Sequence, residues 1–217
     1  MWLLSPPGVY APQEDTRLLE AALRREPLPP AARVLDVCTG SGALAIAASR
    51  HGAAHVTAVD VSARAVLTAR LNGLLARRRI RTVRGDLLAP VAGERFDLVL
   101  ANPPYVPGPS AGHPPRGPAR AHDAGEDGRV VLDRLCTGVP SVLRPSGVLL
   151  LVQSALSEAD RTLALLAAAG LDARISDRAL VPLGPVIRAR AGWLRDRGLL
   201  APGQDKEELV VIRARRT

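Results

Sequence analysis

Hydrophobic and polar positions alternate in a strand–helix rhythm from residue 33 onward. Short apolar runs that favour buried strands are followed by stretches whose apolar positions lie three or four residues apart, as in an amphipathic helix. This alternation predicts a Rossmann-like α/β fold, a doubly wound and mostly parallel seven-stranded sheet with helices on both faces. The expected strands are residues 34–37, 55–59, 81–83, 96–101, 148–152, 171–176 and 208–214, and the expected helices are 42–50, 63–76, 127–143 and 157–169.

The first 30 residues have a different pattern. Residues 1–13 are irregular and rich in proline, and a short amphipathic helix is predicted from about Glu14. Its apolar stripe is Leu18, Leu19, Ala22 and Leu23, and prolines 27, 29 and 30 end it. We expect this segment to cover an edge of the sheet.

Two segments interrupt the rhythm. Residues 106–126 contain five prolines and no helical or strand period, and loops of this length in compact domains are commonly functional. Residues 179–205 form a basic insertion with Trp193 among several arginines, and 189–197 could form a helix that either faces a substrate or is solvated. Neither segment has the character of a linker between two domains, so residues 1–217 are predicted to form a single domain.

Charge changes this picture little. The net charge of +8 favours nucleic acid as a candidate partner, because clustered cations bind phosphate. However, Lys206 is the only lysine among 29 basic residues. This indicates a compositional bias toward arginine, which raises the net charge without forming a nucleic-acid-binding surface. Five aromatic residues are also too few for an extended base-stacking platform.

Targeting and metal signals are weak. No apolar run approaches the roughly 18 residues of a membrane span, and the N-terminus does not resemble a signal peptide, so a cytoplasmic location is expected. The two cysteines, Cys38 and Cys136, are too few for a disulfide framework. Neither has metal-ligand spacing with the four histidines, and we predict no metal site.

A glycine-rich turn follows the first expected strand. Gly40 and Gly42 would let the backbone pass close to a ligand and turn sharply into the next helix. Asp60 ends the second strand, where a carboxylate can accept hydrogen bonds from both hydroxyls of a ribose. This spacing suits NAD and S-adenosylmethionine (SAM) equally well.

Three further features favour SAM. Asp36 precedes the glycines and would face an ammonium group, which SAM has and NAD lacks. Asp86 ends the third strand, where it could accept from an adenine amino group with Leu87 beside it. The tetrapeptide at 102–105, Asn-Pro-Pro-Tyr, ends the fourth strand and has no role in hydride transfer. Each aspartate alone could equally be a capping or turn residue.

These motifs resemble the HemK family of SAM-dependent methyltransferases, and particularly its short branch in eukaryotes and archaea. The matching pieces are residues 9–16, 36–42, Asp60, 85–87, 102–106, 124–128 and 132–133. The resemblance implies a class I methyltransferase fold and methylation of the glutamine in the Gly-Gly-Gln motif of release factors. Short members often pair with a small zinc-binding activator subunit.

The resemblance also implies a set of site residues. Asn102, Pro103, Pro104 and Tyr105 would be catalytic. Cofactor contacts would come from Tyr10, Thr16, Asp36, Cys38, Thr39, Gly40, Gly42, Asp60, Val61, Asp86, Leu87 and Asn102.

The chain departs from the family pattern in three respects. Cys38 stands where many members have glycine, and the 179–205 insertion has no match. Residues 1–30 do not match the large N-terminal helical domain with which long bacterial members hold release factors, so we expect the mode of substrate binding to differ from theirs. These departures concern the substrate more than the chemistry.

The tetrapeptide suggests how a poor nucleophile could be methylated. The Asn102 side-chain oxygen and the Pro103 carbonyl would accept the N–H groups of a planar amide or amino group, while Tyr105 packs on its plane. Glutamine amides, adenine N6 and guanine N2 all meet that description. A protein glutamine methyltransferase is the leading hypothesis, and the alternatives are a DNA or RNA amino methyltransferase, a small-molecule N-methyltransferase and a scaffold without catalysis.

Overall fold

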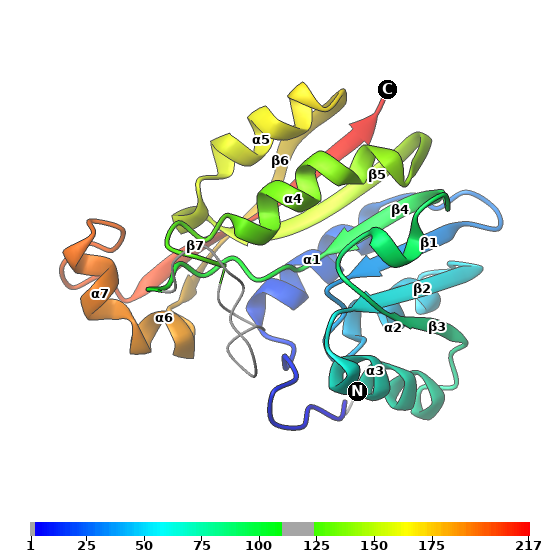
Figure 1. Ribbon diagram of the computed structural model, residues 1–217, viewed down its shortest axis with the longest axis horizontal. Coiled ribbons are helices and arrows are strands. Elements are labelled where there is room, and N and C mark those ends of the chain that lie inside the picture. The colour runs from blue at the N-terminus through cyan, green and yellow to red at the C-terminus, as the bar shows by residue number, and fades with distance from the viewer. Residues whose placement is uncertain (1–2, 110–123) are drawn as a thin grey trace.

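The computed structural model describes residues 3–109 and 124–217, and seven strands form one twisted sheet (Figure 1). The strand order is β3-β2-β1-β4-β5-β7-β6, with β1 to β5 parallel and β7 antiparallel to both of its neighbours. The predicted doubly wound sheet is therefore confirmed. The strands are β1 Arg33–Val37, β2 His55–Asp60, β3 Ile80–Arg84, β4 Phe96–Ala101, β5 Leu143–Ser154, β6 Leu171–Pro182 and β7 Lys206–Arg216.

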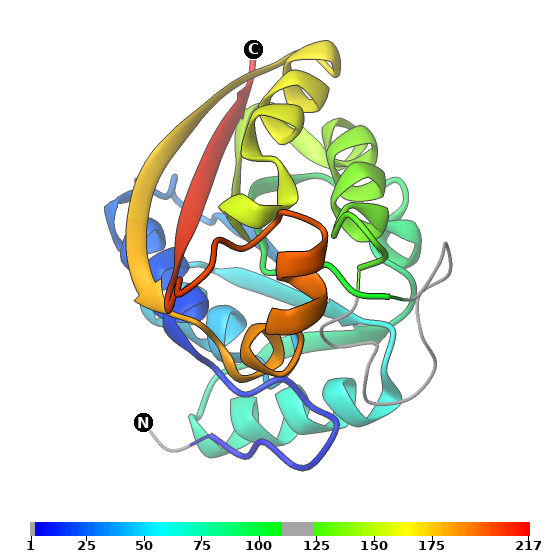
Figure 2. The same ribbon diagram turned by 90° about the vertical axis from the view of Figure 1, so that its left-hand side faces the viewer.

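Helices cover both faces of the sheet (Figure 2). Buried side chains of α1 and α2 join one core cluster with residues of β1, β2, β4 and β5, and those of α4 and α5 join the cluster on the other face. The helices are α1 Glu14–Arg25, α2 Ala43–Arg50, α3 Ala63–Leu75, α4 Val130–Gly138, α5 Ala159–Ala168, α6 Pro185–Ala189 and α7 Ala191–Asp196, with short 3-10 turns at Ala89–Val91, Val139–Ser141 and Ala155–Ser157.

The central strands explain why the apolar runs are continuous. β5 is buried at every position from Gly147 to Ser154. A strand covered on both faces has no solvent-exposed side, so its sequence is an unbroken run of apolar residues rather than an alternation of apolar and polar ones. Burying each leucine side chain contributes about 1.5–3 kcal/mol, which makes β5 and its neighbours the main source of stability.

The sheet reverses direction next to β1. The chain runs outward from β1 through β2 to β3, and then returns to β4 on the other side of β1. Ligands in such sheets bind beyond the carboxyl ends of the strands at this switch point. The loops after β1, β2, β3 and β4 therefore converge at one end of the sheet.

The boundaries differ from the predicted ones in the second half of the chain. The helix expected at 127–143 is only α4, because Pro140 lies two residues after its last residue, Gly138, and the chain passes through a 3-10 turn into β5. β6 continues beyond the expected residue 176 to Pro182, with its side chains alternating between exposed and half-buried. Residues 179–182 thus belong to this edge strand. The single helix expected at 189–197 is divided at Arg190 into α6 and α7.

The helices of the described chain are short or amphipathic, and none has the length and apolar character needed to cross a bilayer.

Candidate active site at the carboxyl ends of the parallel strands

A cavity of about 730 Å³ lies at the switch point of the sheet. This size is typical of small-molecule and cofactor sites. The walls come from the N-terminal segment, the loops after β1 to β4, the start of β7 and helix α6. Among the residues predicted from sequence, those that line it are Tyr10, Cys38, Gly40, Asp60, Val61, Asp86, Leu87 and Asn102 to Tyr105.

The loop after β1 is held in a left-handed conformation. Cys38, Gly40 and Gly42 have φ values of 60°, 54° and 82°. A Cβ atom added to Gly42 would lie 3.0 Å from the Cα and Cβ atoms of Ala69, so glycine lets α2 begin directly against α3. The loop therefore presents its backbone, rather than bulky side chains, to the cavity.

The carboxylate of Asp60 is fixed at the cavity wall. Its Oδ2 atom accepts a hydrogen bond from the Gly40 amide at 3.0 Å, and its Oδ1 atom accepts one from the Ser62 amide at 2.9 Å. Two backbone donors hold the group in one orientation at the end of β2. The structure thus brings the glycine loop and Asp60 together as expected.

Asp86 has a partner that the sequence did not reveal. It forms an ion pair with Arg134 of α4, and both side chains are about half exposed. Exposed pairs of this kind contribute at most about 1 kcal/mol. A ligand amino group at Asp86 would therefore compete with a weakly held arginine at the rim of the cavity.

Asp36 lies behind the glycine loop and is fully buried. Its Oδ2 atom accepts hydrogen bonds from the Thr39 hydroxyl at 2.5 Å and the Ala45 amide at 3.0 Å. Its Oδ1 atom is buried with no partner among the described residues, and burial raises the pKa of the carboxyl group to about 7. Four of the predicted cofactor residues do not line the described cavity and lie behind its wall, namely Asp36, Thr39, Gly42 and Thr16.

The orphaned Asp36 oxygen is relevant to the cofactor prediction. A buried acceptor without a partner costs about 1–3 kcal/mol, and a cationic donor would remove that cost. The residues present thus fit a ligand that has a ribose for Asp60 and an ammonium group near Asp36.

The tetrapeptide after β4 is anchored by the N-terminal segment. The Asn102 amide nitrogen donates to the Thr16 hydroxyl at 3.4 Å. This contact engages the nitrogen, so the amide oxygen is turned away from Thr16. The Tyr105 ring is buried and its hydroxyl donates to Asp15 Oδ2 at 2.9 Å.

Asp15 is a site residue that sequence reasoning missed. Besides Tyr105, it accepts hydrogen bonds from the Tyr10 hydroxyl at 2.6 Å and from the amide and hydroxyl of Thr16. Burial and then the nearby Asp15 carboxylate raise the pKa values of both tyrosines above their usual range. The signal available was the position of Asp15 inside the family-like segment 9–16.

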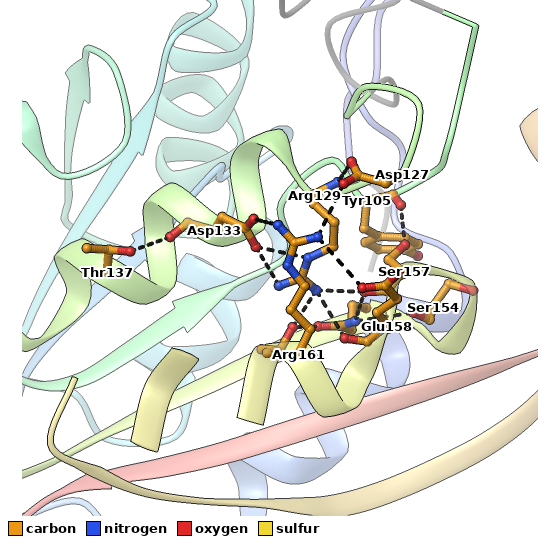
Figure 3. Close-up of polar contacts among 11 residues, drawn as sticks. Tyr105, Asp127, Arg129, Asp133, Thr137, Ser154, Ser157, Glu158 and Arg161 are labelled. Carbon is orange, nitrogen blue, oxygen red and sulfur yellow. Dashed lines mark hydrogen bonds and ion pairs between the residues drawn. The ribbon is translucent and has the colours of Figure 1, made fainter. Parts of the chain in front are cut away.

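A second set of contacts holds the backbone of Tyr105 (Figure 3). The Ser157 hydroxyl donates to the Tyr105 carbonyl, and the Ser157 carbonyl accepts from the Arg129 guanidinium at 2.6 Å. Arg129 is only 1% exposed. It also contacts Asp133 at 2.7 Å and the Thr162 hydroxyl at 2.6 Å, and so joins α4, α5 and the turn between β5 and α5. No pattern in the sequence distinguished this arginine from the many others.

Glu207, at the start of β7, is another residue that sequence reasoning missed. It lines the cavity, yet it is only 5% exposed. The strand had been expected to begin at residue 208 and the insertion to end at residue 205, which left this acid outside both.

The basic insertion reaches the cavity through its uncharged part. Gly184, Pro185, Val186 and Ile187 contribute to the lining. α7 follows beyond α6 (Figure 2), where the Arg197 guanidinium lies 4.8 Å from the centre of the Trp193 ring. The insertion therefore offers an apolar wall to the cavity and places arginines farther out.

Comparisons with known proteins agree with this geometry. The family model described as the methyltransferase small domain matches residues 1–113, more than half of the chain. The chain belongs to the methyltransferase small domain family. A Methanocaldococcus jannaschii relative, named for protein N5-glutamine methylation, is 35% identical to this methyltransferase over 176 residues, 81% of this chain and 87% of the relative. The resemblance to the HemK family is thereby confirmed.

Two further similarities show how far this methyltransferase corresponds to its relatives. The release factor glutamine methyltransferase of Bordetella pertussis is 36% identical over 178 residues, 78% of this chain but 65% of that longer protein. The solved complex of E. cuniculi Mtq2 with Trm112, described as responsible for methylating the termination factor eRF1, superposes with a TM-score of 0.67. That alignment covers 97% of this chain and 99% of the other at 27% identity.

Proposed function

We propose that this methyltransferase uses SAM to methylate the side-chain nitrogen of a glutamine in a Gly-Gly-Gln-type loop of a release factor. The observation that carries the proposal is the position of Asn102 to Tyr105. They follow β4 and line the same cavity as Asp60, Asp86 and the glycine loop. The acceptor site and the cofactor site are therefore adjacent.

Each part of the cofactor would be bound by different residues. Asp60 would bind the ribose hydroxyls, Asp86 and Leu87 the adenine, and Asp36 the ammonium group behind the glycine loop. SAM supplies an electrophilic methyl group on a sulfonium. The short backbone contacts of Asp60 support this assignment, because they hold its carboxylate rigid before any ligand arrives.

The acceptor residues would orient a poorly nucleophilic nitrogen. The lone pair of an amide nitrogen is delocalised, so the site must direct it by holding the N–H groups. The Asn102 oxygen and the Pro103 carbonyl are suitable acceptors, and the Thr16 contact keeps the Asn102 amide in one orientation. Asp15 would fix Tyr105 beside the planar group through its hydroxyl.

The relatives support glutamine as the acceptor. The similar proteins of M. jannaschii and B. pertussis are named for glutamine methylation, and the E. cuniculi complex for the termination factor eRF1. The apolar wall from α6 also favours a small uncharged side chain over a phosphate-bearing nucleotide.

The test is methyl transfer from labelled SAM to purified acceptors. Eukaryotic, archaeal and bacterial release factors would be offered in parallel with DNA and RNA, each factor paired with a variant whose Gly-Gly-Gln glutamine is alanine. We expect label on one class of factor and none on its alanine variant. Label confined to nucleic acid would overturn the proposal.

A small activator subunit is part of the proposal. Helix α3 carries four leucines that are 42–69% exposed and lie at helical spacing, namely Leu67, Leu71, Leu74 and Leu75. Exposed apolar side chains gathered on one element are typical of a protein-binding surface. The E. cuniculi relative forms a complex with Trm112, which supports a partner of that kind here.

A further inference from the structure

Glu207 is a buried carboxylate in the wall of the cavity. It is 5% exposed, although the next residue, Glu208, is partly exposed and pairs with Arg178 across the β6–β7 ladder at 2.8 Å. Glu207 also acts electrostatically on Asp15, Tyr10 and Tyr105, so it lies near the acceptor end of the cavity.

The carboxyl group of Glu207 is only partly satisfied. Hydrogen bonding from the Ser154 side chain and the Gly184 backbone lowers the pKa of this group, but burial raises it by more. Its Oε2 atom is buried and has no hydrogen-bond partner among the described residues. An acceptor in this state is costly unless another molecule supplies a donor, and the cavity is where such a donor would come from.

Methylation of an amide creates a need for a proton acceptor. A primary amide nitrogen carries two hydrogens and its methylated product carries one, so one proton must leave. The Asn102 oxygen and the Pro103 carbonyl can accept hydrogen bonds, but neither is basic enough to keep a proton. A carboxylate is.

The other carboxylates of the described cavity lining are already engaged. Asp15 accepts from Tyr10, Tyr105 and Thr16. Asp60 is held by two backbone amides at the glycine loop. Asp86 and Glu14 pair with arginines and are half exposed. Among the carboxylates of the described lining, which does not include Asp36, Glu207 alone combines deep burial with an oxygen that lacks a partner.

We propose that Glu207 Oε2 takes the proton that the target nitrogen loses on methylation. The inference rests on the proposed function. The nitrogen lone pair forms the new N–C bond while the methyl–sulfur bond breaks and sulfur keeps that electron pair. The electrons of the broken N–H bond stay on nitrogen. The proton moves to Oε2 of Glu207, whose carboxylate becomes a neutral carboxyl group.

The surroundings of Glu207 suit this role. Burial, and to a lesser degree the negative charge of Asp15 on α1, raises the pKa of Glu207 above its usual value. Tyr10, Tyr105, Ser154 and Gly184 are the other groups that face it. Proton acceptors work best when their pKa lies closer to the working pH. The active form is the carboxylate, so activity should fall as pH drops through this raised pKa.

The test compares Glu207→Gln with Glu208→Gln in the full chain. The acceptor is the release factor that the wild-type protein methylates. For Glu207→Gln we expect kcat to fall about 100-fold or more, with the acid limb of the kcat profile removed. SAM and factor dissociation constants, from titration calorimetry, should change less than about threefold, and Glu208→Gln should behave as wild type. Glu207→Asp, which keeps a carboxylate, should retain more activity than the glutamine variant.

Separate results would overturn separate claims. Wild-type protein that labels no release factor would contradict the proposed function itself. A wild-type enzyme that is active while Glu207→Gln keeps its kcat and pH profile would contradict the proton-acceptor role alone. A weakened factor affinity with unchanged kcat would likewise overturn it, because Glu207 would then only bind substrate. Thermal unfolding of each variant identifies any loss of folded protein.

Discussion

Cys38 is a non-glycine residue in a left-handed backbone conformation, at φ 60°, in the middle of the glycine-rich loop. Such a conformation costs an ordinary side chain about 1–2 kcal/mol, and more when the side chain is branched at Cβ. Cys38 also packs against the larger core cluster. The thiol thus occupies a position where its small size limits the strain.

Substituting Cys38 tests this strain. We expect Cys38→Gly to change the free energy of unfolding by less than about 1 kcal/mol, since relief of strain offsets lost packing. Cys38→Val should destabilise by about 2–3 kcal/mol. The matched control is Cys136→Val in helix α4, where a branched residue is tolerated, with an expected loss under about 1.5 kcal/mol. Equal losses in the two valine variants, measured by urea denaturation, would contradict the interpretation.

Asp36 makes stability depend on pH. Burial raises its pKa from 3.8 to about 7, so the folded protein holds a proton that the unfolded chain releases near pH 4. The free energy of unfolding should therefore fall as pH rises from about 4 to 7, by an amount on the order of 4 kcal/mol.

The Asp36→Asn variant isolates this effect. Its stability advantage over wild type should grow between about pH 4 and 7 and then remain constant, because asparagine cannot ionise. The control Asp205→Asn, at an exposed position, should differ from wild type by less than about 0.5 kcal/mol at every pH. Chemical denaturation across that pH range provides the measurement, and a constant Asp36→Asn difference would refute the assignment.

At the scale of elements, the turn before α4 supports the tetrapeptide. Gly128 has φ 73°, and a Cβ atom there would lie 2.3 Å from the Tyr105 carbonyl oxygen. The same carbonyl accepts from Ser157, whose own backbone is held by Arg129 (Figure 3). The position of Tyr105 thus depends on close packing between segments that follow β4 and β5.

Gly128→Ala should disturb this packing. The control is Gly203→Ala, because Gly203 has the same φ of 73° but no atom within 4 Å of an added Cβ. Both variants should lose about 1 kcal/mol from backbone strain, and Gly128→Ala about 2 kcal/mol more from the clash. Methyl transfer by Gly128→Ala should fall at least tenfold in folded protein, with SAM affinity retained. Equal stability and activity in the two variants would show that Tyr105 does not depend on this contact.

At the scale of the whole molecule, the exposed leucines of α3 form the apolar face proposed above for docking of an activator. Leu67 and Leu74 are 57% and 65% exposed and lie seven residues apart, so they share one side of the helix.

Changing both leucines should separate activator binding from folding. We expect the Leu67→Glu and Leu74→Glu double variant to bind a Trm112-type subunit at least tenfold more weakly, with little change in melting temperature. Leu180→Glu is the control, because Leu180 is 68% exposed on the edge strand β6. Calorimetric titration of the purified subunit gives the affinities. Undiminished binding by the double variant would exclude this face as the docking surface.

The sequence by itself determined the parallel sheet, the glycine loop, Asp60 at the end of β2 and the position of the tetrapeptide. These features depend on hydrophobic period and turn chemistry, which act between residues close in the chain. The edge strand β6 was predicted too short because one exposed side leaves its apolar pattern weak.

Only the tertiary structure decided the partners within the site. Asp15 meets Tyr105 across 90 positions, Arg129 meets Ser157 across 28, and Glu207 is enclosed by α1 and by segments around β4 and β5. A charged residue in a sequence carries no sign of its burial, since that depends on which distant segments pack around it. The sequence therefore determined which loops meet at the cavity, and packing decided which carboxylates line it.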